Sequence, residues 1–113
     1  MSDCIFCKIA NKEISSQLIF EDDKVVAFRD LNPQAPQHIL IVPKQHFANI
    51  LEVDDKEIAA RIFTEVVPKV AKIAGVEETG FRLVINTGKD GGQTVEHLHV
   101  HLLGGRDMQW PPG

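Results

Sequence analysis

Three histidines occupy alternate positions in residues 97–103, whose sequence is HLHVHLL. In a β-strand alternate side chains lie on one face, so His97, His99 and His101 would share a face while the residues between them point into a core. Successive imidazoles would lie about 6.6 Å apart, because a strand rises about 3.3 Å per residue. Imidazole titrates near neutral pH, and a row of three on one face therefore indicates chemistry rather than an incidentally polar surface.

Two kinds of chemistry suit such a face. A central imidazole with a polar neighbour on either side can act as a nucleophile, and alternating histidines on a strand can also chelate a metal ion. The spacing alone leaves both open. The preceding loop, residues 86–94 (NTGKDGGQT), contains paired glycines that let backbone N–H groups approach an anion, with Gln93 and Thr94 as further donors. This loop favours a phosphate ligand and a nucleophilic histidine.

The other apolar patterns predict an α+β fold around an antiparallel sheet. Two short apolar runs, residues 17–20 and 24–29, are joined by three acidic residues and indicate a hairpin. Residues 38–42 form a continuous run that ends at Pro43, which suits a central strand covered on both faces. Residues 81–86 predict another strand.

One amphipathic helix is predicted in the middle of the chain. Asp54 or Asp55 can cap its start, and Gly75 suits its C-terminal end. Pro68 should bend this helix or divide it in two. The apolar stripe follows at spacings of three and four residues: Ile58, Ile62, Val66, Val70 and Ile73.

Composition excludes several classes of partner. Twelve Lys and Arg against sixteen Asp and Glu give a net charge of −4, and no two basic residues are adjacent, whereas proteins that bind long nucleic acids present clustered cations. No apolar run approaches the roughly 18 residues of a membrane span, and the first residues lack a signal-peptide pattern. We therefore expect one cytoplasmic domain, residues 1–113, that binds neither nucleic acid nor membrane but can still accept a single nucleotide.

These residues together resemble the histidine-triad (HIT) family, whose signature is His-φ-His-φ-His-φ-φ with φ apolar. The resemblance spans essentially the whole chain and is closest to the Hint branch, through residues 19–23, 27–30, 33–38, 91–93, 97–103, 104–106 and 110–113. Fhit-like dinucleoside polyphosphate hydrolases, the other well-known branch, typically have Pro-Arg after the triad, where this chain has two glycines. The resemblance implies a HIT-like antiparallel five-stranded sheet with one main helix and a short helix.

The activity implied by the resemblance is hydrolysis at the α-phosphate of nucleotides, here of purine nucleoside 5′-phosphoramidates, with no cofactor required for catalysis. His99 would be the nucleophile that becomes a nucleotidyl-histidine, and His101 would contact the phosphate. His97 would support His99 through its backbone carbonyl, and His38 would lie behind the triad in a relay. Two alternatives are hydrolysis of dinucleoside polyphosphates and a nucleotide-binding regulator with incidental turnover.

The resemblance also implies the substrate contacts. Asp30 would accept hydrogen bonds from the ribose hydroxyls, whereas Phe6, Phe28 and Leu31 would form an apolar slot for a purine. Without the resemblance these three apolar residues would be interpreted as core. Position 94 is Thr where Hint members commonly have Ser, and the added methyl group can shift the leaving-group preference. The full substrate-binding set is Asp30, Asn86, Gly92, Gln93, Thr94, Phe6, Phe28, Leu31 and Trp110.

A homodimer is the oligomeric state that the resemblance implies, with the two sheets joined across a two-fold axis. In the Hint branch the segment matching residues 104–113, which includes Trp110, lies near the active site of the partner subunit and affects substrate choice. By composition alone, this segment is a tail with little order of its own.

Cys4 and Cys7 form a Cys-x2-Cys pair, which is too few ligands for a zinc site. His46 and His97 can complete the set, and some HIT relatives carry zinc in this arrangement. Many Hint members lack the cysteines and bind no metal, so two reduced thiols are the other interpretation. If a structural zinc is bound, it would fix the N-terminal segment, residues 1–12, and take no part in phosphoryl chemistry.

Overall fold

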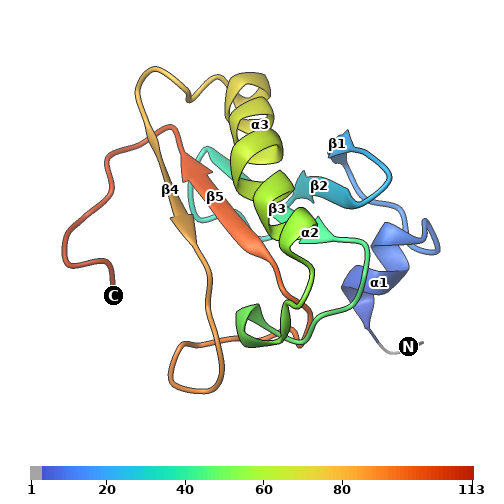
Figure 1. The fold of residues 1–113 in the computed structure, drawn as a ribbon. Coiled ribbons are helices and arrows are strands. Elements are labelled where there is room, and N and C mark those ends of the chain that lie inside the picture. Colours follow the sequence, from blue (N-terminus) through green and yellow to red (C-terminus); the bar gives the residue numbers. More distant parts are fainter. Residues whose placement is uncertain (1–3) are drawn as a thin grey trace.

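The computed structural model describes residues 4–113 as an antiparallel sheet with helices on both of its faces (Figure 1). Residues 1–3, the start of the predicted segment 1–12, lie outside the described residues. The strands are β1 (Leu18–Glu21), β2 (Val25–Arg29), β3 (Gln37–Pro43), β4 (Phe81–Val84) and β5 (Val100–Gly104). The helices are α1 (Ile5–Ala10), the 3-10 helix η1 (Ile50–Glu52), α2 (Lys56–Arg61), the π-helix η2 (Ile62–Val66) and α3 (Val67–Ala74).

The strand order is β1-β2-β3-β5-β4, which confirms the predicted five-stranded α+β fold and the hairpin of β1 and β2. β3 is the central strand and pairs with β2 and β5. Ile39 and Ile41 of β3 belong to the larger core under α2, η2 and α3, whereas Leu40 and Val42 belong to a smaller core under α1. The continuous apolar run is thus explained by a strand that is covered on both faces.

The predicted amphipathic helix runs through α2, η2 and α3 in succession (Figure 1). Asp55 caps it, because its carboxylate accepts the backbone N–H groups of Glu57 and Ile58. The last member of the predicted stripe is wrong: Ile73 is 56% exposed. Ala74 packs against the core instead, because it continues the buried face of α3 formed by Val67, Val70 and Ala71 at spacings of three and four residues.

Pro68 divides the helix by changing its hydrogen-bond pattern rather than by breaking it. The residue lies in the first turn of α3, directly after the π-helical turn, where its missing N–H is tolerated. Gly75 ends the helix in the left-handed conformation with φ 74°, as predicted. No helix in residues 4–113 has the length and apolar character needed to cross a membrane.

Two strands are shorter than predicted. β4 ends at Val84 rather than at residue 86, and β5 begins at Val100 rather than at His97. The end of β3 explains the second difference, because Pro43 has no N–H to continue the ladder and its carbonyl accepts the side chain of His97. His97 and His99 therefore precede the strand, and their orientation depends on side-chain contacts as well as on the sheet.

Candidate active site and metal cluster

The triad histidines lie on the face of the sheet opposite the larger core. His97 and His99 are buried and both contact the ring of Phe6, which belongs to the smaller core. The rings of His99 and His101 have centroids 4.9 Å apart at 64°, closer than the strand repeat predicts because the rings tilt toward each other. The residues between the histidines are buried in the larger core, as predicted: Leu98, Val100 and Leu102.

One backbone hydrogen bond sets the tautomer of His99. Its Nδ1 lies 2.7 Å from the carbonyl oxygen of His97. A carbonyl can only accept, so Nδ1 carries the proton and Nε2 keeps its lone pair. The ring is 6% exposed and lines a surface pocket, so this arrangement offers His99 Nε2 as a nucleophile.

A second chain of hydrogen bonds sets the tautomers of His38 and His101. The backbone N–H of Gln34 donates to His38 Nδ1 at 3.0 Å, so His38 carries its own proton on Nε2. That proton is donated to His101 Nδ1 across 2.9 Å. His101 must therefore carry its proton on Nε2, and it presents an N–H donor beside His99.

Burial keeps both relay imidazoles neutral. It lowers the pKa of His101 to about 4, with the neighbouring His99 and His38 as further causes. Burial also lowers the pKa of His38, although the carboxylate of Asp30, 3.5 Å from its Nε2, opposes that change. Neutral rings at pH 7 agree with the tautomers deduced from the hydrogen bonds.

A pocket of about 300 Å³ opens in front of His99 and His101. Its wall includes Phe6 on α1 and Phe28 on β2, whose rings meet edge to face with centroids 5.6 Å apart. Its other lining combines one acidic, one basic and three hydroxyl side chains with apolar groups: Asp30, Arg29, Ser15, Ser16, Thr94, Ile5, Ile9, Ile14, Leu31, Leu40 and Val95. An apolar cleft with a few convergent polar groups is the usual form of a small-molecule site.

The predicted substrate residues fall into two groups. Five of them line the pocket, although Leu31 does so from the rim and is 97% exposed. The lining does not include Asn86, Gly92, Gln93 or Trp110.

Gln93 shapes the glycine-rich loop, a role that the sequence did not indicate. Its Nε2 donates to the carbonyls of Ala48 at 2.7 Å and Val95 at 2.9 Å, and its Oε1 accepts the N–H of Gly88. Its own N–H donates to the Gly88 carbonyl. The hydrogen bond to Ala48 holds the loop against the segment after β3, and the other three stabilise the fold of residues 88–95 itself.

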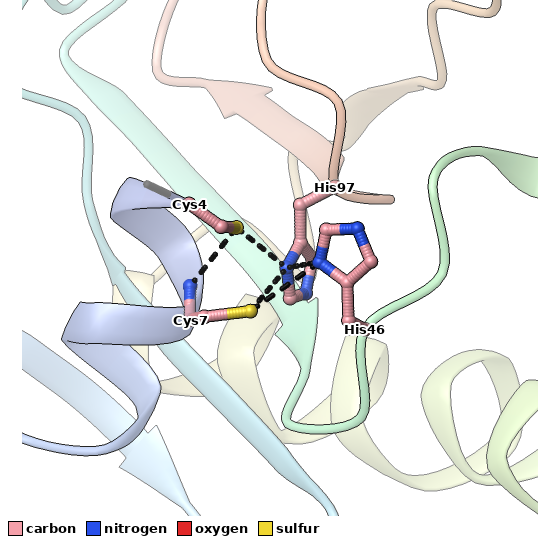
Figure 2. A group of neighbouring side chains, drawn as sticks. All are labelled: Cys4, Cys7, His46 and His97. Carbon is pink, nitrogen blue, oxygen red and sulfur yellow. Dashed lines mark hydrogen bonds between the residues drawn. The ribbon is translucent and has the colours of Figure 1, made fainter. Parts of the chain in front are cut away.

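Two Cys and two His meet beside α1 (Figure 2). Cys4 and Cys7 come from the N-cap and first turn of α1, His46 from the loop after β3, and His97 from the segment before β5. His97 Nδ1 lies 3.2 Å from Cys4 Sγ, 3.4 Å from Cys7 Sγ and 3.2 Å from His46 Nδ1, and Cys7 Sγ lies 3.3 Å from His46 Nδ1.

These separations fit a tetrahedral metal ion. With Zn–S about 2.3 Å and Zn–N about 2.0–2.1 Å, tetrahedral ligands lie about 3.6 Å apart for S and N and about 3.3 Å apart for two N atoms. His97 Nε2 is 2.9 Å from the Pro43 carbonyl, which places its proton there and leaves Nδ1 free toward the sulfurs. Burial raises the pKa of the Cys7 thiol to about 11, with Cys4 as a further cause, and a bound cation would favour the thiolate instead.

Asp30, His38 and His101 form a second group of potential metal ligands, but their protons argue against a metal there. The 2.9 Å contact between the two rings is a hydrogen bond, and His38 Nε2 carries the proton that a metal would have to displace. The triad imidazoles also face different partners, so they do not chelate one ion together.

The structure thus combines an α+β fold with three alternating histidines beside an apolar pocket. One of these histidines has a free Nε2 lone pair, and another has an Nε2–H donor. These features define the histidine-triad class of proteins. The family model described as "HIT domain" matches residues 11–108. The chain therefore belongs to the HIT family, and its fold is the HIT fold.

Relatives of similar length match nearly the whole chain. A protein of Synechococcus elongatus described as an uncharacterized HIT-like protein is 51% identical, with 98% of this chain and 97% of that protein covered. A 14 kDa zinc-binding protein of Zea mays is also 51% identical, with 99% and 89% covered. The crystal structure of a HIT family hydrolase from Legionella pneumophila has a TM-score of 0.93 at 51% identity and covers 98% of this chain and 100% of that one.

Acid should destabilise the fold through the buried imidazoles. The pKa of His101 is about 4 when folded against an ordinary value of 6.5, so the unfolded chain binds more protons between these values. The free energy of unfolding is expected to fall as the pH drops from 6.5 to about 4. Urea titrations across this range measure it, and His101→Gln should reduce the slope. An NMR titration showing the ring of His101 already charged at pH 6 would contradict this assignment.

Proposed function

We propose that this protein hydrolyses purine nucleoside 5′-phosphoramidates through a nucleotidyl-histidine intermediate on His99. The observation that carries the proposal is the pair of tautomers: a lone pair on His99 Nε2 lies beside an N–H on His101 Nε2, at one pocket. One group is suited to attack phosphorus, and the other to stabilise negative charge on a phosphate oxygen. The HIT family hydrolase neighbours support hydrolysis as the general reaction class.

The chemistry would proceed in two displacements at phosphorus. In the first, His99 Nε2 forms a bond to phosphorus as the P–N bond breaks, and the amine leaves with the electron pair and takes up a proton from solvent. In the second, water attacks phosphorus, the bond to Nε2 breaks, and a proton is released to solvent. In both, the His97 carbonyl would stabilise positive charge on the His99 ring through the Nδ1–H.

The pocket supports a nucleoside as the bound group. Phe6 and Phe28 line the pocket with two aromatic rings against which a purine could pack. One carboxylate oxygen of Asp30 accepts the N–H of Asn32 at 2.7 Å, which orients the carboxylate so that it could accept hydrogen bonds from ribose hydroxyls. The loop residues Asn86, Gly92, Gln93 and Thr94 are proposed to lie on the phosphate side.

Replacement of the nucleophile gives the decisive test of this activity. His99→Ala should reduce hydrolysis of adenosine 5′-phosphoramidate on the order of 10³-fold or more, because it removes the attacking lone pair. Steady-state rates at saturating substrate measure the effect, and mass spectrometry of quenched wild-type protein should detect a nucleotidyl adduct that the variant lacks.

Other outcomes would identify the alternatives. Faster turnover of dinucleoside polyphosphates than of phosphoramidates would favour that hydrolase activity. Nucleotide binding without turnover or adduct would indicate a binding protein. Metal-free histidine chemistry would be contradicted if a chelator abolished turnover at saturating substrate while the protein remained folded.

We also propose a structural zinc ion held by Cys4, Cys7, His46 and His97. The ligand separations and the proton positions support it, and a relative 51% identical to this chain is called a zinc-binding protein. When bound, the ion would cross-link the N-terminal segment to the rest of the domain. None of the four ligands lines the nucleotide pocket, which supports a structural rather than a catalytic role.

Metal analysis distinguishes the two ligand clusters. Purified wild-type protein should contain one zinc per chain, and Cys4→Ser/Cys7→Ser should contain none, because two histidines alone hold zinc weakly. His38→Gln is the matched control, since it disrupts the other cluster and should retain the zinc. Chelation should lower the melting temperature of wild type. This assignment would be overturned if the His38→Gln variant lost the zinc while the Cys4→Ser/Cys7→Ser variant kept it.

We further propose a homodimer that forms along the β4 edge of the sheet. β4 lies at the end of the strand order, so its outer backbone groups are unpaired within the sheet. Beside it is an apolar hollow of about 230 Å³ lined in part by Ile62, Phe63 and Ile85. Ile50 and Phe63, which both line this hollow, are 43% and 44% exposed, and clustered exposed apolar side chains are typical of protein–protein contact surfaces.

The position of the C-terminal tail supports the same edge. Arg82 on β4 donates to the carbonyl of Gln109, and the tail passes outside β4 (Figure 1). Trp110 is 81% exposed and outside the pocket of its own chain. A paired copy would allow residues 104–113 to reach the partner's active site.

A charge placed at this edge should dissociate the dimer. Sedimentation of the wild-type protein should give twice the chain mass of 12.6 kDa, and Phe63→Glu should give the single mass, because a carboxylate would be buried without a partner. Leu18→Glu is the control on the opposite edge strand, and it should remain dimeric. A wild-type protein that sediments as a monomer would contradict the proposal.

A further inference from the structure

Helix α1 contributes to both the metal cluster and the nucleotide pocket. Cys4 caps the helix and accepts the N–H of Cys7, and both sulfurs face the histidines of the cluster. Phe6 and Ile9, on the same six-residue helix, line the pocket. So short a helix has little stability of its own, and its position depends on the contacts it makes at these two sites.

Phe6 is the most direct connection between the sites. It lies between the two cysteines in sequence, and its ring centroid is 4.9 Å from that of His99 and 6.0 Å from that of His97. The side chain is buried among apolar residues of β2 and β3. Any movement of the cysteine pair must therefore move a ring that touches both the nucleophile and the pocket wall.

His97 makes a second connection through its own covalent structure. Its Nδ1 belongs to the cluster, and its carbonyl oxygen accepts the Nδ1–H of His99 at 2.7 Å. The Pro43 carbonyl holds the remaining ring nitrogen. The residue that would bind the ion is thus also the residue that orients the nucleophile.

We infer that zinc at the cluster and a nucleotide in the pocket bind cooperatively, each raising the affinity for the other. The inference rests on the proposed zinc and nucleotide sites. The ion would hold α1 through both cysteines, with Phe6 placed for a purine, and a nucleotide packed on Phe6 would in turn hold the cysteines in position. No ligand of the cluster lines the pocket, so the coupling is indirect, and it must be equal in both directions.

Two affinities measured on the full chain test this linkage. The zinc affinity is measured by competition with a chromogenic chelator that buffers free zinc, with and without saturating adenosine 5′-monophosphate. The affinity for the monophosphate is measured by calorimetry on zinc-loaded and zinc-free protein. We expect each ligand to tighten the other by the same factor, within the roughly 5- to 150-fold range of such couplings.

A matched pair of variants tests the route through α1. Phe6→Leu and Phe28→Leu each remove one aromatic ring from the pocket wall, but only Phe6 lies between the cysteines. Both should weaken binding of the monophosphate. The coupling factor should fall well below its wild-type value in Phe6→Leu, where only the connection through His97 remains, and keep its wild-type value in Phe28→Leu.

The outcomes separate this inference from the proposals beneath it. If both ligands bind and neither changes the affinity of the other by more than twofold, the linkage is wrong while both sites stand. A full coupling factor in Phe6→Leu overturns the route through α1. If one of the two ligands does not bind at all, both the linkage and the binding site proposed for that ligand are wrong, while the other site stands.

Discussion

The imidazole of His97 has 0% of its surface exposed, so both of its ring nitrogens need a partner inside the protein. The Pro43 carbonyl accepts its Nε2–H at the point where β3 can no longer continue its ladder. The other nitrogen must then face the cysteines, and the backbone carbonyl of the same residue is left to accept from His99. One buried residue thus connects the end of the central strand, the Cys/His cluster and the ring of His99.

The protonation pattern of the active site is set by backbone groups rather than by charges. The N–H of Gln34 determines the tautomer of His38, which determines that of His101, and a carbonyl determines that of His99. Without the Gln34 N–H, either ring of the relay pair could carry the shared proton, and the donor would point toward the pocket only part of the time. Fixing one backbone donor therefore keeps a neutral N–H directed at the pocket, where we propose the phosphate to bind, without burying a cation.

Features that depend on local pattern were predictable from the sequence, whereas those that depend on a distant partner were not. The continuous apolar run at residues 38–42 reflects a strand that is buried on both faces. The alternation of histidine and apolar residues around His99 reflects a segment with one face in the larger core. The late start of β5 at Val100, which pairs with Ile41, depends on the end of β3 two residues further along at Pro43. A spacing of three or four residues from Val70 allows either Ile73 or Ala74 on the buried face, and packing of α3 against the sheet selects Ala74. The short helix α1 carries no periodic pattern of its own, and the sheet determines which of its side chains are buried.

The two clusters of potential ligands show why residue type and distance alone do not identify a metal site. Both have all their ligand atoms within 4.8 Å of one another. Around His97 Nδ1 the lone pairs converge, because the ring's proton is held on the far side by Pro43. Around His38 Nε2 a proton already occupies the space between the rings, because a backbone N–H has taken the other nitrogen. Imidazoles therefore contribute to the proposed ion site in one cluster and to a proton-ordered relay in the other, and the difference lies in which ring nitrogen bonds to the main chain.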